Sequence, residues 1–241
     1  MDQTEQLLQE VRAALASEPR LDTHAWPLEL KLGDGVLTIE GEVLDVAQKK
    51  LALERAAAVH GVIGILDRLR VHPAQPMGDR EILDHVRDAL LQEPAFKELV
   101  LREDRGGWRV IREPATEARG RVDVAVEDGV VTLNGQVSGL DQKRLAGVLA
   151  WWVPGSRDVI NGIAVEPPEE DSDAAIADAL RLVLEKDPFV DASQLRFSVG
   201  DAVVTLTGIV PKEAERNMAE YDGWYVFGVD KVINRIEVRA G

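Results

Sequence analysis

The chain has 241 residues, and its 45% hydrophobic and 29% charged side chains are typical of soluble globular protein rather than of disordered segments. Its formal net charge of −15 disfavours binding to nucleic acid or to an anionic membrane through charge alone. The lack of cysteine excludes disulfides, thiolate catalysis and Cys-ligated metal sites.

No apolar run reaches the roughly 18 residues that a transmembrane helix needs, so we expect no membrane span. The acidic start lacks both the basic and the apolar region of a secretory signal. If Met1 is the native start, we therefore expect a cytoplasmic protein.

The first 73 residues predict two helices and three strands in the order α-β-β-α-β. After the first helix and the hairpin, the expected elements are a strand at 36–43, a helix at 45–59 and a strand at 63–71. The first helix, from Leu7, ends at Pro19, because a proline disfavours helical backbone in the residue before it. Gly41 interrupts a strand, which indicates a bulge or the close approach of another backbone. Gly61 is expected to end the second helix.

The same order of elements recurs twice more along the chain. A strand glycine is followed by a second glycine at a fixed distance of 20 residues in each copy. These glycines are Gly41 and Gly61, Gly135 and Gly155, and Gly208 and Gly228. Three coincident landmarks in three copies are not produced by chance, so the chain is predicted to be three repeats. We place them at 1–73, 79–166 and 172–241, with proline-bearing linkers between them.

Each repeat is expected to be a small α+β domain, with a mixed three-stranded sheet and two helices on one face. The motif Asp128-Gly-Val-Val-Thr-Leu-Asn-Gly135-Gln-Val137, followed by a helix and the strand Val159-Ile-Asn-Gly-Ile163, resembles the BON domain. The family is named for bacterial osmotically inducible and nodulation proteins. The resemblance covers nearly the whole chain, as three copies of the domain. The third copy departs from the pattern at Ala202, where the other two copies have a glycine in the hairpin turn.

The resemblance implies a non-catalytic module, often attributed to phospholipid or envelope association and to osmotic stress. A cytoplasmic type of relative binds potassium. No catalytic residues come with the family, so only the six repeat glycines carry over, as structural residues.

The second repeat carries an insertion of about 20 residues, at about 98–120. The distance from the helix-ending proline to the strand glycine is 41 residues there, against 22 and 20 in its siblings. The insertion predicts a hairpin turning at Gly106-Gly107. Arginines outnumber acids there, and Arg105, Trp108, Arg109 and Arg112 are candidate partner-binding residues, since guanidinium groups suit phosphates and carboxylates. The alternative is a solvated extension whose charges pair with one another. Because its siblings lack it, we expect deletion of the hairpin tip, residues 102–112, to leave the fold largely intact, since such tips contribute little to a core.

A second difference between the repeats is aromatic. Trp151 and Trp152 fall at the end of the second helix of repeat 2, and repeat 3 has Trp224 and Tyr225 at the same point. These rings are expected to pack in the core or between repeats, and the alternative is that they bind an external partner.

No nucleophile elbow, zinc-protease, phosphate-loop or dinucleotide motif occurs. We therefore expect no enzyme, no cofactor and no metal site. The leading hypothesis is a non-enzymatic interaction protein with a protein or envelope-lipid partner. The alternative is a sensor of a small monovalent cation such as potassium, held by backbone carbonyls at the repeat junctions.

Overall fold

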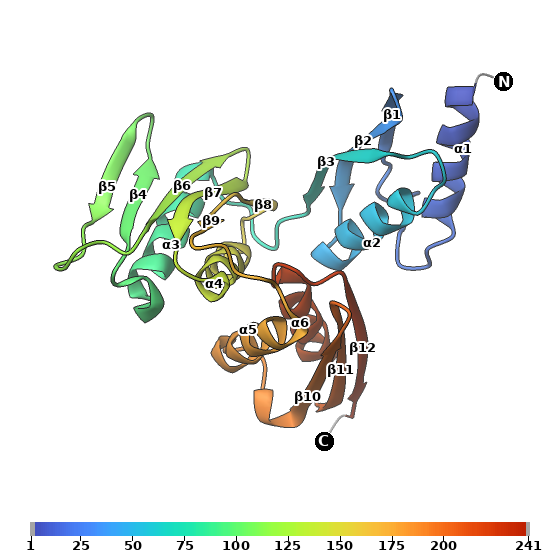
Figure 1. The fold of residues 1–241 in the computed structure, drawn as a ribbon. Coiled ribbons are helices and arrows are strands. Elements are labelled where there is room, and N and C mark those ends of the chain that lie inside the picture. The colour runs from blue at the N-terminus through green and yellow to red at the C-terminus, as the bar shows by residue number, and fades with distance from the viewer. Residues whose placement is uncertain (1–2, 240–241) are drawn as a thin grey trace. The chain divides into compact units, whose positions relative to one another are not determined.

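A computed structural model of the chain describes residues 3–239. The chain divides into two compact units, of which the first ends at His72 and the second begins at Pro73 (Figure 1). Repeat 1 forms the first unit, and repeats 2 and 3 together form the second.

Repeat 1 has the predicted order of elements. They are α1 (Gln3–Ala16), β1 (Glu29–Gly33), β2 (Val36–Val43), α2 (Val46–Ala57) and β3 (Gly64–Val71). The central strand β2 pairs antiparallel with β1 and parallel with β3. Alternate side chains of β2, including Leu37 and Ile39, are buried beneath the helices, because successive residues of a strand point to opposite faces. The other face of this sheet carries no helix.

Repeat 3 repeats this arrangement. Its elements are α5 (Asp173–Lys186), the short helix η2 (Ala192–Gln194), β10 (Leu195–Gly200), β11 (Val203–Val210), α6 (Glu213–Tyr225) and β12 (Lys231–Val238). The strand order is β10-β11-β12, again antiparallel and then parallel. The Ser172 hydroxyl caps α5 by accepting from the Ala175 N–H.

Repeat 2 has a larger sheet than the three strands predicted. Its elements are α3 (Asp79–Gln92), η1 (Pro94–Phe96), β4 (Val100–Asp104), β5 (Trp108–Arg112), β6 (Arg121–Glu127), β7 (Val130–Val137), α4 (Leu140–Trp151), β8 (Asp158–Asn161) and β9 (Ala164–Val165). The strand order is β5-β4-β6-β7-β8, and β9 also pairs with β7. The insertion supplies β4 and β5, so the predicted hairpin at Gly106-Gly107 is confirmed.

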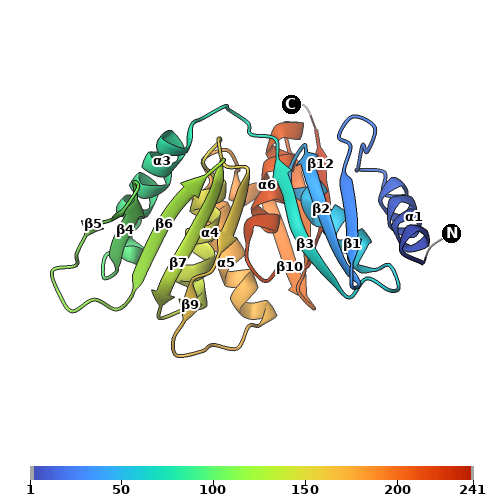
Figure 2. The ribbon, with the colours of Figure 1, turned by 90° about the horizontal axis from the view of Figure 1, so that it is seen from above.

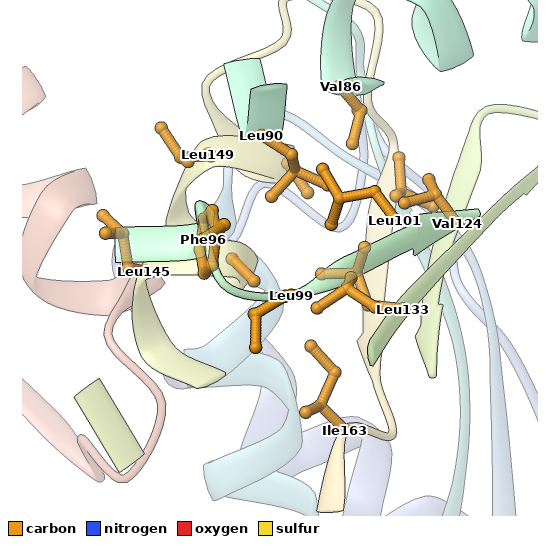
Figure 3. Packing of buried hydrophobic residues seen from close by; sticks show 14 of the residues in the cluster. Val86, Leu90, Phe96, Leu99, Leu101, Val124, Leu133, Leu145, Leu149 and Ile163 are labelled. Carbon is orange, nitrogen blue, oxygen red and sulfur yellow. The ribbon is translucent and has the colours of Figure 1, made fainter. Parts of the chain in front are cut away.

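The insertion supplies core residues just before the hairpin tip at 102–112. Leu99 and Leu101 are fully buried, and Figure 3 shows them among Leu90, Val124 and Leu133 in the core of repeat 2. The reason is that β4 pairs parallel with β6, which places alternate residues of β4 beneath α3. From the outer strand β5, the partly buried Ile111 packs against this core.

The glycine after each second helix does not end that helix, contrary to expectation. The helix α2 ends at Ala57 and α4 at Trp151, and the next residue of each keeps a right-handed helical backbone. Gly61 lies further on, at a φ of +102° that side chains rarely adopt. Gly155 serves packing instead, because an added Cβ would lie 2.6 Å from the Cβ of Met77.

A carboxylate at the first helix joins that helix to the hairpin in both repeats of the second unit. Asp79 accepts hydrogen bonds from the N–H groups of Asp128 and Gly129, at 3.0 and 2.8 Å. Asp173 accepts from Asp201 and Ala202, at 2.9 Å each. The turn N–H groups are thus satisfied by a side chain outside the hairpin, which fixes the helix against the sheet.

Within the second unit, repeats 2 and 3 pack through helices: α4 contacts both α5 and α6 (Figure 2). The linker between the repeats is held to α4, because Glu169 accepts a hydrogen bond from the N–H of Leu140, the first residue of that helix.

Candidate binding surface

The strand β5 is the outer edge of the six-stranded sheet. Among the described strands it pairs with β4 alone, so one side of its backbone is unpaired. Trp108 and Val110 are 48% and 53% exposed, and the register places them opposite Asp104 and Arg102. Since Leu101 and Glu103 of β4 are buried under the helices, these two apolar side chains lie on the face of the sheet without helices.

An ion-pair network holds Trp108 in place on that face. The guanidinium of Arg102 lies 5.3 Å from the Trp108 ring centre and donates to both oxygens of Asp123, at 2.6 and 2.7 Å. Arg121 donates to the same carboxylate at 2.9 Å. The Asp123 carboxylate is buried and shared by two cations, so it orients Arg102 beneath the ring.

Two of the candidate arginines make contacts inside the repeat. Arg105 donates to Glu103 at 2.6 Å and also to Asp84 of α3. The hydrogen bond that Arg105 donates to Glu103, and next the one that it donates to Asp84, raise the pKa of Arg105. Arg112 donates to the backbone oxygens of Leu91 and Phe96 and thus joins the end of β5 to the end of α3. Both side chains are therefore engaged in fixing the hairpin to the repeat.

Arg109 differs from the other candidates, because its side chain makes no hydrogen bond or ion pair with any other residue in the range 3–239. It lies on the helix side of β5, opposite Glu103, and is exposed. It lines a shallow depression of about 480 Å³ beside the start of α3. The other lining residues are Asp79, Arg80, Leu83, Asp104, Arg105, Gly106 and Val126. Arg109 is thus the candidate arginine whose charge is available to a partner.

Trp151 and Trp152 both contact repeat 3. The Trp151 ring stacks on that of Tyr225, with centres 5.3 Å apart and planes 13° from parallel. The Trp152 indole N–H donates to a carboxylate oxygen of Asp222 at 2.9 Å. These contacts are packing between repeats, the first of the two roles that the sequence left open for this pair.

The strand glycines lie where another backbone approaches. A Cβ at Gly135 would lie 2.1 Å from the Arg121 carbonyl oxygen, and one at Gly208 would lie 2.3 Å from that of Gln194. Gly41 is less crowded, with the Pro27 oxygen at 3.1 Å, but its φ of +147° also favours glycine. The close approach predicted from their place in a strand is confirmed.

Gly228 makes room for an interaction between the repeats. A Cβ there would lie 2.7 Å from a carboxylate oxygen of Asp171 and 3.2 Å from Nη2 of Arg144. Arg144, on α4, is 1% exposed, bonds to Asp171 in the linker, and donates to the Phe227 oxygen at 2.8 Å. Sequence reasoning missed Arg144, because an arginine on a helix is usually solvated and its partners lie in the next repeat.

Two further findings concern metal and membrane. Within residues 3–239, no three or more His, Cys, Asp or Glu side chains gather in a group that could hold a metal ion. None of the helices in that range is long and apolar enough to cross a membrane.

Comparison with solved structures finds two chains of CdsD, a structural protein of the type III secretion system of Chlamydia trachomatis. One is 15% identical and covers 98% of this chain and 93% of its own, with a TM-score of 0.25. The other is the C-terminal domain of CdsD, 14% identical, covering 99% and 100%, also with a TM-score of 0.25. No curated protein matches this chain.

The BON domain matches three separate segments, residues 3–73, 111–167 and 172–240. The unmatched stretch in repeat 2 contains α3 and β4. Together the three segments cover most of the sequence, and each contains a strand glycine and the glycine 20 residues after it. The chain therefore belongs to the BON domain family, as tandem copies of that domain.

Proposed function

We propose that this protein is a non-enzymatic interaction protein that binds an extended segment of another protein along β5. The observation that carries the proposal is the edge position of β5, with Trp108 and Val110 exposed beside unpaired backbone groups. An extended segment added to such an edge gains main-chain hydrogen bonds, and its alternate side chains contact the exposed residues.

Charge selects the kind of segment. The strand Trp108-Arg-Val-Ile-Arg112 has two arginines and no acid, in a chain whose net charge is −15. Arg109 is free to pair, whereas Arg112 is held by backbone oxygens. A segment that carries a carboxylate opposite Arg109 is therefore favoured over a basic one. A second copy of this chain is disfavoured, because β5 against β5 would bring like charges together.

The family resemblance supports a second class of partner, anionic envelope lipid. The basic residues of the hairpin are mostly paired, and the surrounding chain is acidic, so the structure favours the protein partner. A role in osmotic stress, a potassium-like ligand and a cytoplasmic location stay predictions.

The test places a photo-activated cross-linking residue at Val110 in the full chain, in cells that naturally contain the protein. The matched control places it at Phe189, which is 69% exposed on repeat 3 and lies outside β5. We expect a discrete protein adduct from position 110 that is absent from position 189 and is lost when Arg109→Glu is added. Flotation of the purified chain with phosphatidylglycerol vesicles is measured beside it.

Flotation that depends on Trp108 and Arg109, without an adduct from position 110, would show that the partner is lipid and not protein. An adduct that Arg109→Glu leaves unchanged would contradict the role of charge. If the experiments give no adduct and no flotation, the assignment of β5 as the binding strand is overturned.

A further inference from the structure

One pair of positions is filled differently in each repeat. The first position precedes the proline at the end of the first helix, and the second lies six residues before the second repeat glycine. These pairs are Glu18 and Arg55, Glu93 and Leu149, and Asp187 and Asp222. Because the repeats share one fold, the three pairs occupy equivalent places.

In repeat 1 the pair is an ion pair. Arg55 donates to one carboxylate oxygen of Glu18 from Nε at 3.0 Å and from Nη2 at 2.7 Å. Glu18 is 6% exposed, so its charge is compensated where it is buried. In repeat 2 the second position is the buried Leu149, and Glu93 bonds to Lys186 at 2.9 Å.

In repeat 3 both positions are acids, and both are buried. Asp187 and Asp222 are 4% and 0% exposed. The N–H of Phe189 donates to Oδ1 of Asp187 at 2.8 Å, and the Trp152 indole donates to Oδ1 of Asp222. The Oδ2 atom of each carboxyl is buried and accepts no hydrogen bond from the described residues. The two side chains are within hydrogen-bonding reach of each other.

No cation among the residues that the structure describes compensates this pair. The basic residues of the three helices that meet here are all engaged elsewhere. Lys143 lies over Phe227, Arg144 bonds to Asp171, Arg181 to Asp178, Lys186 to Glu93 and Arg216 to Glu213. Of the other acids, Glu220 accepts from Trp224 and Asn234, and the one charged group that acts on Asp222 is Asp187.

We propose that Asp187 and Asp222 share one proton, which takes the place of the arginine of repeat 1 and makes the contact between repeats 2 and 3 dependent on pH. A proton taken from solvent forms an O–H bond on Oδ2 of one carboxyl. That O–H donates to Oδ2 of the other, so one proton satisfies both unpaired oxygens. The pair then carries one negative charge, and the Trp152 indole of repeat 2 donates to it.

The pKa of Asp222 is raised, which is the direction that a shared proton requires. Burial, and next the charge of Asp187, raise the pKa of Asp222, while the hydrogen bond from Trp152 lowers it. A carboxyl whose pKa is raised on folding stabilises the folded state when protonated, and this stabilisation is lost as pH rises through the raised pKa. Above that pH the pair carries two like charges in a buried place, and their repulsion is relieved if repeat 3 separates from repeat 2.

The indole N–H of Trp152 reports on the pair directly. In the ¹⁵N-labelled full chain, its resonance is assigned with Trp152→Phe and followed as pH is raised. We expect one titration step, with a midpoint above the usual aspartate value of 3.8, because the indole donates to the carboxyl that ionises. Asp222→Asn should abolish the step, because it removes the carboxyl to which the indole donates. Asp187→Asn should move the midpoint to lower pH, because the charge of Asp187 no longer raises the pKa of Asp222 and an amide N–H can replace the shared proton. Glu185→Gln, an exposed acid on the same helix, should leave it unchanged.

Thermal unfolding gives an independent measure. The melting temperature of the wild type should fall relative to that of Asp187→Asn as pH rises through the midpoint, and the two should converge below it. A flat Trp152 resonance in the wild type from pH 3 to pH 8 overturns the proposal. So does a step that persists in Asp222→Asn or keeps its midpoint in Asp187→Asn, in whichever variant is folded.

Discussion

At the scale of the residue, the strand glycines are the positions where a single methyl group has the largest effect. The Cβ of Gly135→Ala would overlap the Arg121 oxygen, and the residue has a φ of +118°. We expect a loss of at least about 2 kcal/mol in unfolding free energy, because backbone must move and the φ is strained.

The matched control is Gly129→Ala in the same repeat. Its φ of +75° is tolerated by alanine in repeat 3, where Ala202 has a φ of +58° at the equivalent place. The new Cβ would meet the side chain of Arg157 rather than backbone. Urea denaturation should show the smaller loss at Gly129, and equal losses would mean that backbone approach is not the cause.

A second residue-scale prediction concerns the ion pair of repeat 1. Although burial by itself would raise it, the pKa of Glu18 is lowered by hydrogen bonds from Arg55 and from the Arg20 backbone. A lowered pKa contributes stability that is present above the unfolded value and is lost as pH falls through the folded value. Glu18→Gln should therefore lower the melting temperature of the first unit at neutral pH and make no difference at low pH. A deficit that is the same at all pH values would show that the ion pair is not responsible.

At the scale of the element, the hairpin β4–β5 divides into a structural inner strand and an outer strand open to a partner. Arg102→Ala should lower the melting temperature by more than Arg109→Ala, because Asp123 is buried and would keep only Arg121. Arg109 has no intramolecular partner, so its removal should be near neutral. Scanning calorimetry of the two variants measures this. A larger effect at Arg109 would mean that the inner network contributes little.

The elements themselves were predictable from sequence because they depend on local patterns. Helical spacing, prolines and the fixed glycine distance located α1, α3 and α5 within a few residues, and Gly106-Gly107 located the turn of the hairpin. Two things were not predictable. The place of Leu101 in the core depends on β4 pairing with β6, from which it is separated in sequence by β5. The helix α2 ends at Ala57, before the Gly61 expected to end it.

For the candidate site too, local sequence patterns were informative and contacts between distant residues were not predictable. The composition of the sequence located the basic hairpin. Which of its arginines are engaged depends on partners distant in sequence, such as Asp84 and Asp123, and only the structure shows them. The sequence does contain a signal for the acid pair of repeat 3. When the repeats are aligned by their glycines, Asp222 occupies the position of the apolar Leu149. Only the structure shows that the Trp152 indole donates a hydrogen bond to Asp222.

At the scale of the whole molecule, the two units predict separate unfolding. The second unit should lose stability in Arg144→Ala by about 2 kcal/mol, because the Phe227 oxygen and Asp171 lose a donor buried between repeats. The transition of the first unit should stay unchanged. Calorimetry of the full chain resolves the two transitions, and a single transition shifted as a whole would contradict their independence.

The buried Arg144, which bonds both to Asp171 and to the Phe227 backbone oxygen beside Gly228, bears on how such a chain can change over generations. Copies that arise by duplication are at first interchangeable, and recombination can add or remove one of them. Once a guanidinium of one copy is buried against the next, loss of the last copy exposes a helix face adapted to its neighbour. Repeats 2 and 3 are therefore expected to be inherited as one unit.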